Sequence, residues 1–207
     1  MDIILLVTRS KMTKPAFLVE GDLEQKFVQN TCPGCPVQKI NCNGDSVSVG
    51  SIAKRVGTLG RLLHKKHSPL VIVFDRERRT DTSEEIESQF RKELQTEDIQ
   101  VPVIVGIPDR DIENWILADF EIFQQAIGAN ADPNHESFEG HKGKTVIKKH
   151  LGQGRSYVET IDGVAWLKSC RPDIMSKNSF SFAKFAQALS GISCWWLKQH
   201  HLTETTS

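Results

Sequence analysis

Two short stretches of this sequence place acidic side chains at the end of an apolar run. The stretch FLVEG carries Glu20 near its end, and the stretch LVIVFDRE ends with Asp75 and Glu77. Each run has the continuous, β-branched character of a buried strand in a parallel sheet. Because ligand sites in open α/β sheets lie beyond the carboxyl ends of the strands, neighbouring strands would bring the three carboxylates together. Carboxylates that share one small volume repel one another unless a hard cation lies between them, and oxygen ligands suit Mg²⁺ or Mn²⁺.

Three further acidic residues are candidates for the same site. Glu24 lies one helical turn beyond Glu20, and Asp109 and Glu113 follow a third apolar run, VPVIVGIP, where they could complete a second metal site. Carboxylates at strand ends also cap helices and face solvent, so a structural role stays open for each of them. Asp119 falls six residues after Glu113, nearly on the opposite side of the same expected helix, and we expect it to be structural.

A basic stretch at 141–155 follows the acidic one, and no acidic residue lies between Glu139 and Glu159. Such a patch suits the binding of phosphodiesters, and Lys144 is our candidate for stabilising the charge of a transition state. The alternative is a solvated helix face. The tripeptide GKT is not part of a P-loop, because Phe138 stands where that motif needs Gly. The candidates for nucleic-acid binding are Lys142, Lys144, Lys148, Lys149 and Arg155.

The cysteines raise a smaller question. Cys32 and Cys35 form a C-x-x-C motif, Cys42 follows seven residues later, and His64 and His67 form an H-x-x-H motif. Four such residues could bind Zn²⁺, but the long gap before the histidines is unlike a compact zinc knuckle. We favour free thiols in a loop and keep zinc as the alternative.

The strands and helices that must position these side chains alternate along the chain. Continuous apolar runs predict strands, and apolar residues at helical spacing predict the helices between them. Asp22 and Ser83 are predicted N-terminal caps, and Ser83 forms an approximate capping box with Glu87. The expected strands are 15–20, 37–42, 70–74 and 101–108, and the expected helices are 22–30, 50–66, 83–95, 111–127, 158–169 and 179–198.

The composition sets wide limits. The chain has 207 residues, of which 26 are basic and 26 acidic, so only local patches could attract nucleic acid. The length fits one domain or one domain with an extension. The opening DIILLV is too short to span a bilayer and lacks the features of a signal peptide, and Met12 could be an alternative start. An odd count of five cysteines argues against a disulfide framework, so we expect a reduced, cytosolic protein.

Taken in order, the motifs resemble the TOPRIM domain of topoisomerases, bacterial primases, recombination-mediator proteins and overcoming-lysogenization-defect nucleases. They are an E-G-x-x-E at 20–24, a strand ending in D-x-E at 75–77, and the segment IPDRDIENWILAD at 107–119. That last segment, with GKTVIKKHL, YVETIDG and SFAKFAQAL further on, is similar to small bacterial TOPRIM-like proteins of largely unknown function, several of which belong to phage-defence systems. The resemblance covers residues 15–190. It divides the chain into an N-terminal extension (1–14), a catalytic domain (15–127), a C-terminal helical elaboration (128–200) and a tail (201–207).

This resemblance implies both a fold and an activity. The fold is α/β, with a compact, mainly parallel, TOPRIM-like sheet flanked by helices and a C-terminal helical extension. In that family the glutamate, here Glu20, acts as a general acid/base or a metal ligand, and the acidic pair, here Asp75 and Glu77, holds Mg²⁺ or Mn²⁺. Glu77 stands in place of the family's second aspartate, which puts a second metal in question. The implied activity is metal-dependent endonuclease cleavage of DNA or RNA.

The resemblance also implies a setting for this activity. Such proteins often act as antiphage effectors beside an ABC-type ATPase that senses infection, in the cytoplasm and away from membranes. The chain has no nucleotide-binding loop of its own, which fits a two-protein arrangement, and a homo-oligomer is left open. Two other functions stay open as well: a non-catalytic TOPRIM-like module that binds a partner or nucleic acid, and phosphoryl or nucleotidyl transfer on a small molecule.

Overall fold

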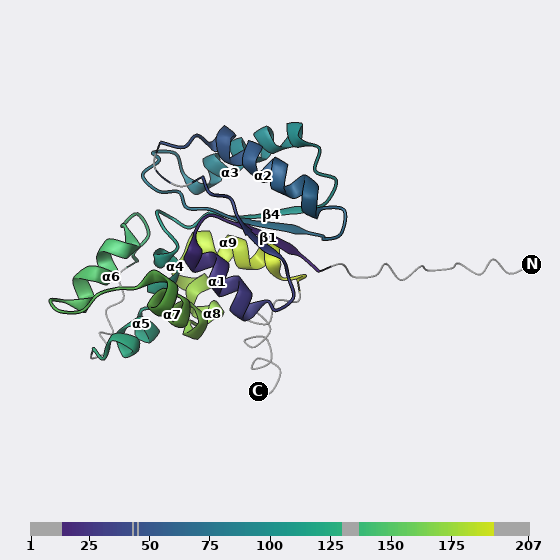
Figure 1. Cartoon of the computed structure of the whole chain (residues 1–207). Coiled ribbons are helices and arrows are strands. Elements are labelled where there is room, and N and C mark those ends of the chain that lie inside the picture. Colours follow the sequence, from purple (N-terminus) through teal and green to yellow (C-terminus); the bar gives the residue numbers. More distant parts are fainter. Residues whose placement is uncertain (1–13, 43, 45, 130–136, 193–207) are drawn as a thin grey trace, which may run out of the picture.

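A computed structural model of the chain describes residues 14–42, 44, 46–129 and 137–192 (Figure 1). The predicted tail, and all but the last residue of the predicted N-terminal extension, lie outside these ranges. In the described part of the chain, four parallel strands form one sheet in the order β2-β1-β3-β4. All four strands were predicted, and each is shorter than expected: β1 is Ala16–Val19, β2 is Val37–Lys39, β3 is Leu70–Val73 and β4 is Val103–Gly106.

The central strands are in register, and this is what positions the site. Val19 of β1 pairs with Val73 of β3, and Val73 pairs with Gly106 of β4. Side chains alternate between the two faces of the sheet, so Val19 and Val73 join one core while Leu18 and Ile72 join the other. Because the strands end at the same level, the residues that follow them meet along one edge of the sheet.

One face of the sheet is covered by α2 (Val49–Leu63) and α3 (Ser83–Leu94), which also pack against each other (Figure 1). Ile86 and Phe90 of α3 are fully buried there. The ring of Phe90 lies 5.2 Å from that of Phe74, which directly follows β3. This layer therefore holds the loop after β3 close to the sheet.

Helix α3 begins at Ser83 as expected, but its N-terminal cap lies one residue before the predicted one. Its capping box is formed by Thr82 and Glu85, because the Thr82 hydroxyl accepts a hydrogen bond from the Glu85 amide while the Glu85 carboxylate accepts one from the Thr82 amide. The predicted pair of Ser83 and Glu87 was wrong, since the spacing of three residues that the box requires falls on Thr82 and Glu85.

Helix α1 (Asp22–Thr31) follows β1 almost directly. The prediction that Asp22 caps it was also wrong: the cap is Gly21, and Asp22 is the first helical residue. The Asp22 carboxylate instead pairs with Nζ of Lys39 on β2 at 2.8 Å. Gly21 has no side chain that could cap the helix. The carboxylate of Glu24 instead accepts hydrogen bonds from the backbone amides of Gly21 and Glu24.

The second face of the sheet is covered by helices from both halves of the chain (Figure 1). The ring of Trp115 stacks on Phe185 at a centroid distance of 5.1 Å and meets Phe182 edge-on at 5.4 Å. These C-terminal aromatic residues share one core with Val19 and Val73 of the strands, so the predicted C-terminal extension completes the main core. The helices of this face are α1, α4 (Glu113–Ala118), α7 (Val164–Ser169), α8 (Pro172–Asn178) and α9 (Phe180–Leu189).

The predicted long helix over 111–127 is two helices. The chain breaks at Asp119, between α4 and α5 (Phe120–Ile127), where φ is −105° and ψ is 69°. The fully buried Asp119 carboxylate accepts hydrogen bonds from Nε and Nη2 of Arg171 at 2.9 and 2.7 Å, and from the Arg171 amide at 2.8 Å. Asp119 therefore joins α5 to the start of α8, a structural role as expected.

Three further elements complete the described structure: the 3-10 helix η1 (Gln95–Glu97), α6 (Gly143–Leu151) and the π-helix η2 (Glu159–Gly163). The predicted helix over 158–169 is divided between η2 and α7, and the last part of the predicted helix over 179–198 lies outside the described residues. Among the described helices, none combines the length and the apolar composition that a bilayer crossing requires.

Candidate functional site

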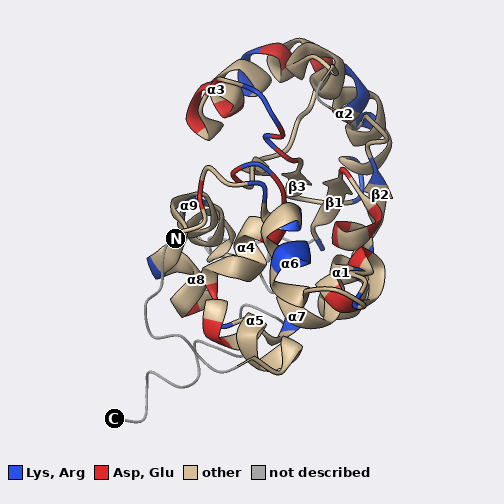
Figure 2. Cartoon of the chain, turned by 90° about the vertical axis from the view of Figure 1, so that its left-hand side faces the viewer, with Lys and Arg blue, Asp and Glu red and all other residues tan. Residues whose placement is uncertain are grey.

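Five buried or half-buried carboxylates gather at the carboxyl edge of the sheet. Figure 2 looks onto this edge and shows α1, α4 and α6 grouped beside the ends of β1 and β3. One carboxylate follows β1, one follows β3, two follow β4 and one lies in the first turn of α1. We call this group the acidic cluster, and its members are Glu20, Glu24, Asp75, Asp111 and Glu113.

The centre of the acidic cluster is the pair Glu20 and Asp75. Oε2 of Glu20 accepts a hydrogen bond of 2.6 Å from the backbone amide of Asp75. The two residues lie close together because β1 and β3 are adjacent and in register. Glu20 is only 5% exposed. The predicted convergence of these two residues is therefore present in the structure.

Glu24 and Glu113 reach the cluster from the first turns of two helices. The Glu24 carboxylate folds back over the start of α1, where a Cβ added at Gly21 would lie 2.8 Å from Oε2 of Glu24. Glu113 begins α4, is 2% exposed, and accepts a hydrogen bond of 3.1 Å from the hydroxyl of Tyr157. Helix N-termini stabilise negative charge, which partly offsets the cost of gathering these acids.

Asp111 is a member that the sequence interpretation missed. Its Oδ2 accepts a hydrogen bond of 3.3 Å from the backbone amide of Lys144 in the first turn of α6. The approach of α6 depends on Gly143, because a Cβ there would lie 2.6 Å from Oδ1 of Asp111 and 2.7 Å from the amide nitrogen of Asn114. The Asp111 amide in turn donates to Oδ1 of Asn114 at 3.3 Å. This three-residue spacing resembles a helix cap, and it was the one sequence signal that could have identified Asp111.

Two oxygens of the acidic cluster have no hydrogen-bond partner among the described residues. They are Oδ1 of Asp75 and Oδ1 of Asp111, and both are buried. Buried polar atoms are almost always satisfied, so an unpartnered carboxylate oxygen needs an explanation such as an ion or a bound group.

The electrostatics of the cluster point the same way. Burial, reinforced by neighbouring negative charges, raises the pKa of Glu20 and Glu24 to about 7, that of Asp111 to about 6 and that of Glu113 to about 8. The same causes hold the pKa of Asp75 well above its ordinary value, with Glu24 and Glu20 the strongest repelling charges. Each carboxylate is therefore costly to ionise in this place without a compensating positive charge.

Lys144 is one of the cations that the described structure places beside these acids. Its Nζ pairs with Oε1 of Glu159 at 2.8 Å, and both side chains are partly exposed. Burial lowers the pKa of Lys144, but the hydrogen bond to Glu159 and the charges of Glu113, Glu159 and Asp111 outweigh that effect and raise it. Lys144 is therefore charged and close to the cluster, as a transition-state cation would need to be.

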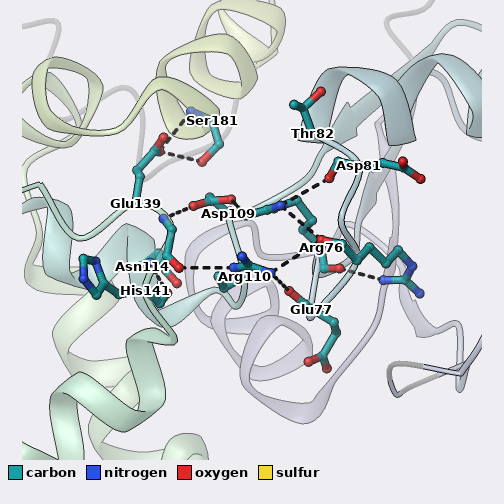
Figure 3. Close-up of polar contacts among 12 residues, drawn as sticks. Arg76, Glu77, Asp81, Thr82, Asp109, Arg110, Asn114, Glu139, His141 and Ser181 are labelled. Carbon is teal, nitrogen blue, oxygen red and sulfur yellow. Dashed lines mark hydrogen bonds and ion pairs between the residues drawn. The ribbon is translucent and has the colours of Figure 1, made fainter.

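Glu77, predicted as a third central ligand, lies at the rim of the cluster. It is half-buried and has a left-handed backbone with φ of 57°, which is unusual for a residue other than glycine. Its amide donates to the carbonyl of Arg110 at 2.7 Å, and Nη1 of Arg110 donates back to the carbonyl of Glu77 at 3.1 Å. Figure 3 shows that the Glu77 carboxylate extends away from Arg110. Its charge is close enough to raise the pKa of Glu20 and of Asp111.

Asp109, predicted as a ligand of a second metal, is placed in a different network. Its carboxylate forms an ion pair with Nη2 of Arg76 (Figure 3). It also accepts a hydrogen bond from the amide of Gly140. Nη1 of Arg76 also donates to the carbonyls of Arg79 and Asp81, each at 3.2 Å. Asp109 thus ties together the loops after β3 and β4, and its charge is already neutralised.

The predicted basic residues separate into different places. Lys142 lines a hollow beside the acidic cluster, whereas Lys148 and Lys149 are exposed on α6. Arg155 donates from Nη1 to the carbonyl of Ile127 at 2.5 Å, which fixes the loop after α6 to the end of α5. Of the predicted basic residues, Lys142 and Lys144 are therefore the two that adjoin the cluster.

The zinc site that was kept as an alternative for the cysteines is absent from the described residues. Cys32 is buried and disulfide-bonded, so the preference for a free thiol was wrong there, whereas Cys35 and Cys42 are free and half-buried. Nδ1 of His64 accepts a hydrogen bond from the Gln100 amide at 3.3 Å. The described ranges contain no group of three histidine, cysteine or acidic side chains that is already arranged to hold a metal ion.

That geometric result applies to the acidic cluster too, but its chemistry fits a divalent cation. All five members are hard oxygen donors, and two oxygens lack a partner. The raised pKa values reflect burial first and mutual repulsion second, and a cation would offset both. Small rotations of the carboxylates would have to accompany binding. Glu20, Glu24, Asp75 and Glu113 are the residues that could hold such an ion, with Asp111 beside them.

Comparison with known proteins adds a family match without a function. A family model described as a domain of unknown function, DUF4276, matches residues 19–190. No curated protein and no solved structure matches the chain. The matched range includes every member of the acidic cluster and Lys144.

Proposed function

The chain belongs to the DUF4276 family, and from its acidic cluster we propose that it is a divalent-metal-dependent nuclease that hydrolyses nucleic-acid phosphodiesters. The observation that carries this proposal is the environment of Asp75. One of its carboxylate oxygens is buried without a partner, and four other carboxylates surround it. Such an arrangement fits a hard cation better than any partner the described residues provide.

The site would bind Mg²⁺ or Mn²⁺ through Glu20, Glu24, Asp75 and Glu113. A bound divalent ion would offset the negative charge that develops on phosphate oxygens during in-line attack. This use of the cluster accounts for the raised pKa values, which make little sense for five acids that serve only to hold the fold together.

Two side chains of the second half of the protein have defined roles in this proposal. Lys144 presents Nζ beside Asp111 and Glu113, where it can stabilise charge on a phosphate group or a leaving oxygen. Tyr157 donates its hydroxyl proton to Oε1 of Glu113, which fixes that carboxylate and leaves its other oxygen for the cluster.

The wider setting of the activity rests on the TOPRIM resemblance alone. On that basis we propose that the protein acts in the cytoplasm, as the effector of an antiphage system, together with an ABC-type ATPase partner. The polymeric substrate has additional support from Lys142 and from the exposed Lys148 and Lys149 of α6.

Two measurements on the full chain test the proposal. Calorimetric titration with Mn²⁺ and Mg²⁺ should detect binding by the wild type, and labelled DNA and RNA should be cleaved only when one of these ions is present. Asp75→Asn should abolish both effects, whereas the matched control Asp173→Asn, an exposed acid of α8, should abolish neither. Cleavage in EDTA, or equal metal binding by Asp75→Asn, would overturn the proposal.

One observation favours a second candidate, a non-catalytic module that binds a partner or nucleic acid through the same fold. In the described residues the carboxylates are not yet arranged around one ion position. If that arrangement is final, the protein will bind no divalent ion and will leave both polymers intact, alone and with an ATPase encoded beside it.

A further inference from the structure

A polar hollow of about 180 Å³ opens beside the acidic cluster. Its wall comes from three segments: the loop after β3, the loop after β4 and the residues just before α6. It shares Asp111 with the cluster, so a group bound in the hollow would lie next to the proposed metal ligands. The lining residues are Glu77, Arg78, Arg110, Asp111, Gly140 and Lys142.

The wall of this hollow carries both acidic and basic groups that have no hydrogen-bond partner in the described structure. Oδ1 of Asp111 is buried and unpartnered, and Asp111 as a whole is 4% exposed. Within the described ranges, neither the Glu77 carboxylate nor the Lys142 ammonium group has a hydrogen-bond or ion-pair partner. The hollow therefore combines two acceptors with at least one free cation.

This combination restricts what can bind. Three basic side chains, those of Arg78, Arg110 and Lys142, disfavour a second metal cation in the hollow. Two carboxylates, those of Glu77 and Asp111, disfavour a bare anion. A ligand that carries a phosphate and also donates hydrogen bonds satisfies both sets, and the sugar-phosphate unit of RNA is such a ligand.

Building on the proposed nuclease function, we propose that the hollow holds the ribonucleotide beside the bond to be cut and makes RNA the preferred substrate. Glu77 and Asp111 accept a hydrogen bond from the ribose 2′-hydroxyl, and Lys142 pairs with the adjoining phosphate. An acidic side chain that accepts from a ribose hydroxyl is a recurrent device for recognising ribonucleotides. Deoxyribose offers no donor at that position, so with DNA the two carboxylates would stay unpaired and desolvated.

Hydrogen bonds between the three segments hold the backbone of the hollow in place, which would help it to distinguish ribose from deoxyribose. Arg110 also has a left-handed backbone, with φ of 75°, and its exchange of hydrogen bonds with Glu77 closes a small ring between the two loops. Nε of Arg110 donates to the carbonyl of Gly140 at 3.2 Å and so fixes the third segment. A preformed wall penalises a ligand that leaves its polar groups unsatisfied.

Binding measured without cleavage tests this inference apart from the nuclease proposal. Fluorescence anisotropy in EDTA would compare labelled RNA, 2′-O-methyl RNA and DNA of one sequence on the wild-type protein. RNA should bind about tenfold more tightly than the other two polymers, because only its 2′-hydroxyl can donate. Equal affinity for the three polymers would overturn the inference, whatever the protein cleaves.

Variants connect the preference to the hollow. Glu77→Ala and Asp111→Asn should each reduce the ratio of RNA to DNA affinity toward one, and Lys142→Ala should weaken the binding of all three polymers. Asp173→Asn and Lys54→Ala, exposed charges on α8 and α2, should leave both ratio and affinity unchanged. A preference for RNA that survives in Glu77→Ala and Asp111→Asn would place the recognition elsewhere. If the wild-type protein cleaves neither polymer but still binds RNA more tightly than DNA, the nuclease proposal fails and the RNA site stands.

Discussion

The backbone amide of Asp75 donates a hydrogen bond of 2.6 Å to the carboxylate of Glu20. The residue two places beyond β3 thus fixes the side chain that directly follows β1. This contact orients one Glu20 oxygen and leaves the buried Oδ1 of Asp75 without a partner in the described structure. The first prediction follows from this pair.

Glu20→Gln should keep the fold and weaken metal binding by on the order of 100-fold. The amide oxygen of glutamine can still accept from Asp75, while the charge that attracts the cation is gone. Calorimetry with Mn²⁺ measures the effect. Asp109→Asn is the matched comparison: it should retain the metal affinity but lose about 3 kcal/mol of stability, because Arg76 would be left buried without its charged partner. The reverse pattern would mean that the site lies at Asp109.

Without a divalent cation, the free energy of unfolding should fall as the pH rises from about 5 to about 8. Folding raises the pKa of Glu20 and Glu24 from 4.5 to about 7 and that of Glu113 from 4.5 to about 8. The folded protein therefore binds more protons than the unfolded chain, and the stability present below the unfolded pKa is lost as the pH passes the folded values. Urea titrations in EDTA measure this slope. Glu113→Gln should make it shallower, and a stability that increases with pH would contradict the assignment.

Mn²⁺ should raise the melting temperature more at pH 8 than at pH 5.5. Protons and the cation compete for the same carboxylates, whose raised pKa values keep them largely protonated at the lower pH. At a concentration 100 times its Kd, a ligand stabilises the folded state by about 2.7 kcal/mol. Differential scanning calorimetry with and without the ion gives the comparison. An equal shift at both values of pH, or the same shift in Asp75→Asn, would indicate binding elsewhere.

Gly143→Ala should destabilise the protein by about 1–3 kcal/mol. A methyl group there would lie 2.6 Å from Oδ1 of Asp111 and 2.7 Å from the Asn114 amide nitrogen, so α6 would have to move away from α4. Thermal unfolding monitored by circular dichroism measures the loss. Thr145→Ala, an exposed change on the same helix, should have little effect. If the two variants are equally stable, the close packing of α6 on α4 is not as described.

Lys144→Ala should lower the cleavage rate by about 100-fold while leaving metal affinity nearly unchanged. The side chain would stabilise charge on the substrate, whereas the carboxylates hold the cation. Single-turnover kinetics on labelled RNA separate this loss from weaker binding. Lys54→Ala on α2 serves as the comparison and should behave like the wild type. Equal rates for both variants would remove Lys144 from the mechanism.

The sheet and the pair Glu20–Asp75 were predictable because buried parallel strands have continuous apolar runs, and such strands end at a common edge. The break at Asp119 was not predictable, because its cause is Arg171, 52 residues later in the chain. For a similar reason, the sequence did not indicate that Asp111, and not Asp109, belongs to the acidic cluster. The left-handed turn at Arg110 separates the two acids, sending Asp109 to Arg76 and leaving Asp111 with the cluster.

Residues from opposite ends of the sequence make up both the core and the site. A chain released at residue 127 would carry all five clustered acids but would lack Lys144, Tyr157 and the C-terminal aromatic side chains, Phe182 and Phe185, that share the core with Val19 and Val73. On the ribosome, the carboxylates therefore emerge well before the parts that shield them and supply their lysine. If the proposed nuclease function holds, cleavage would therefore depend on residues that are synthesised after the carboxylates.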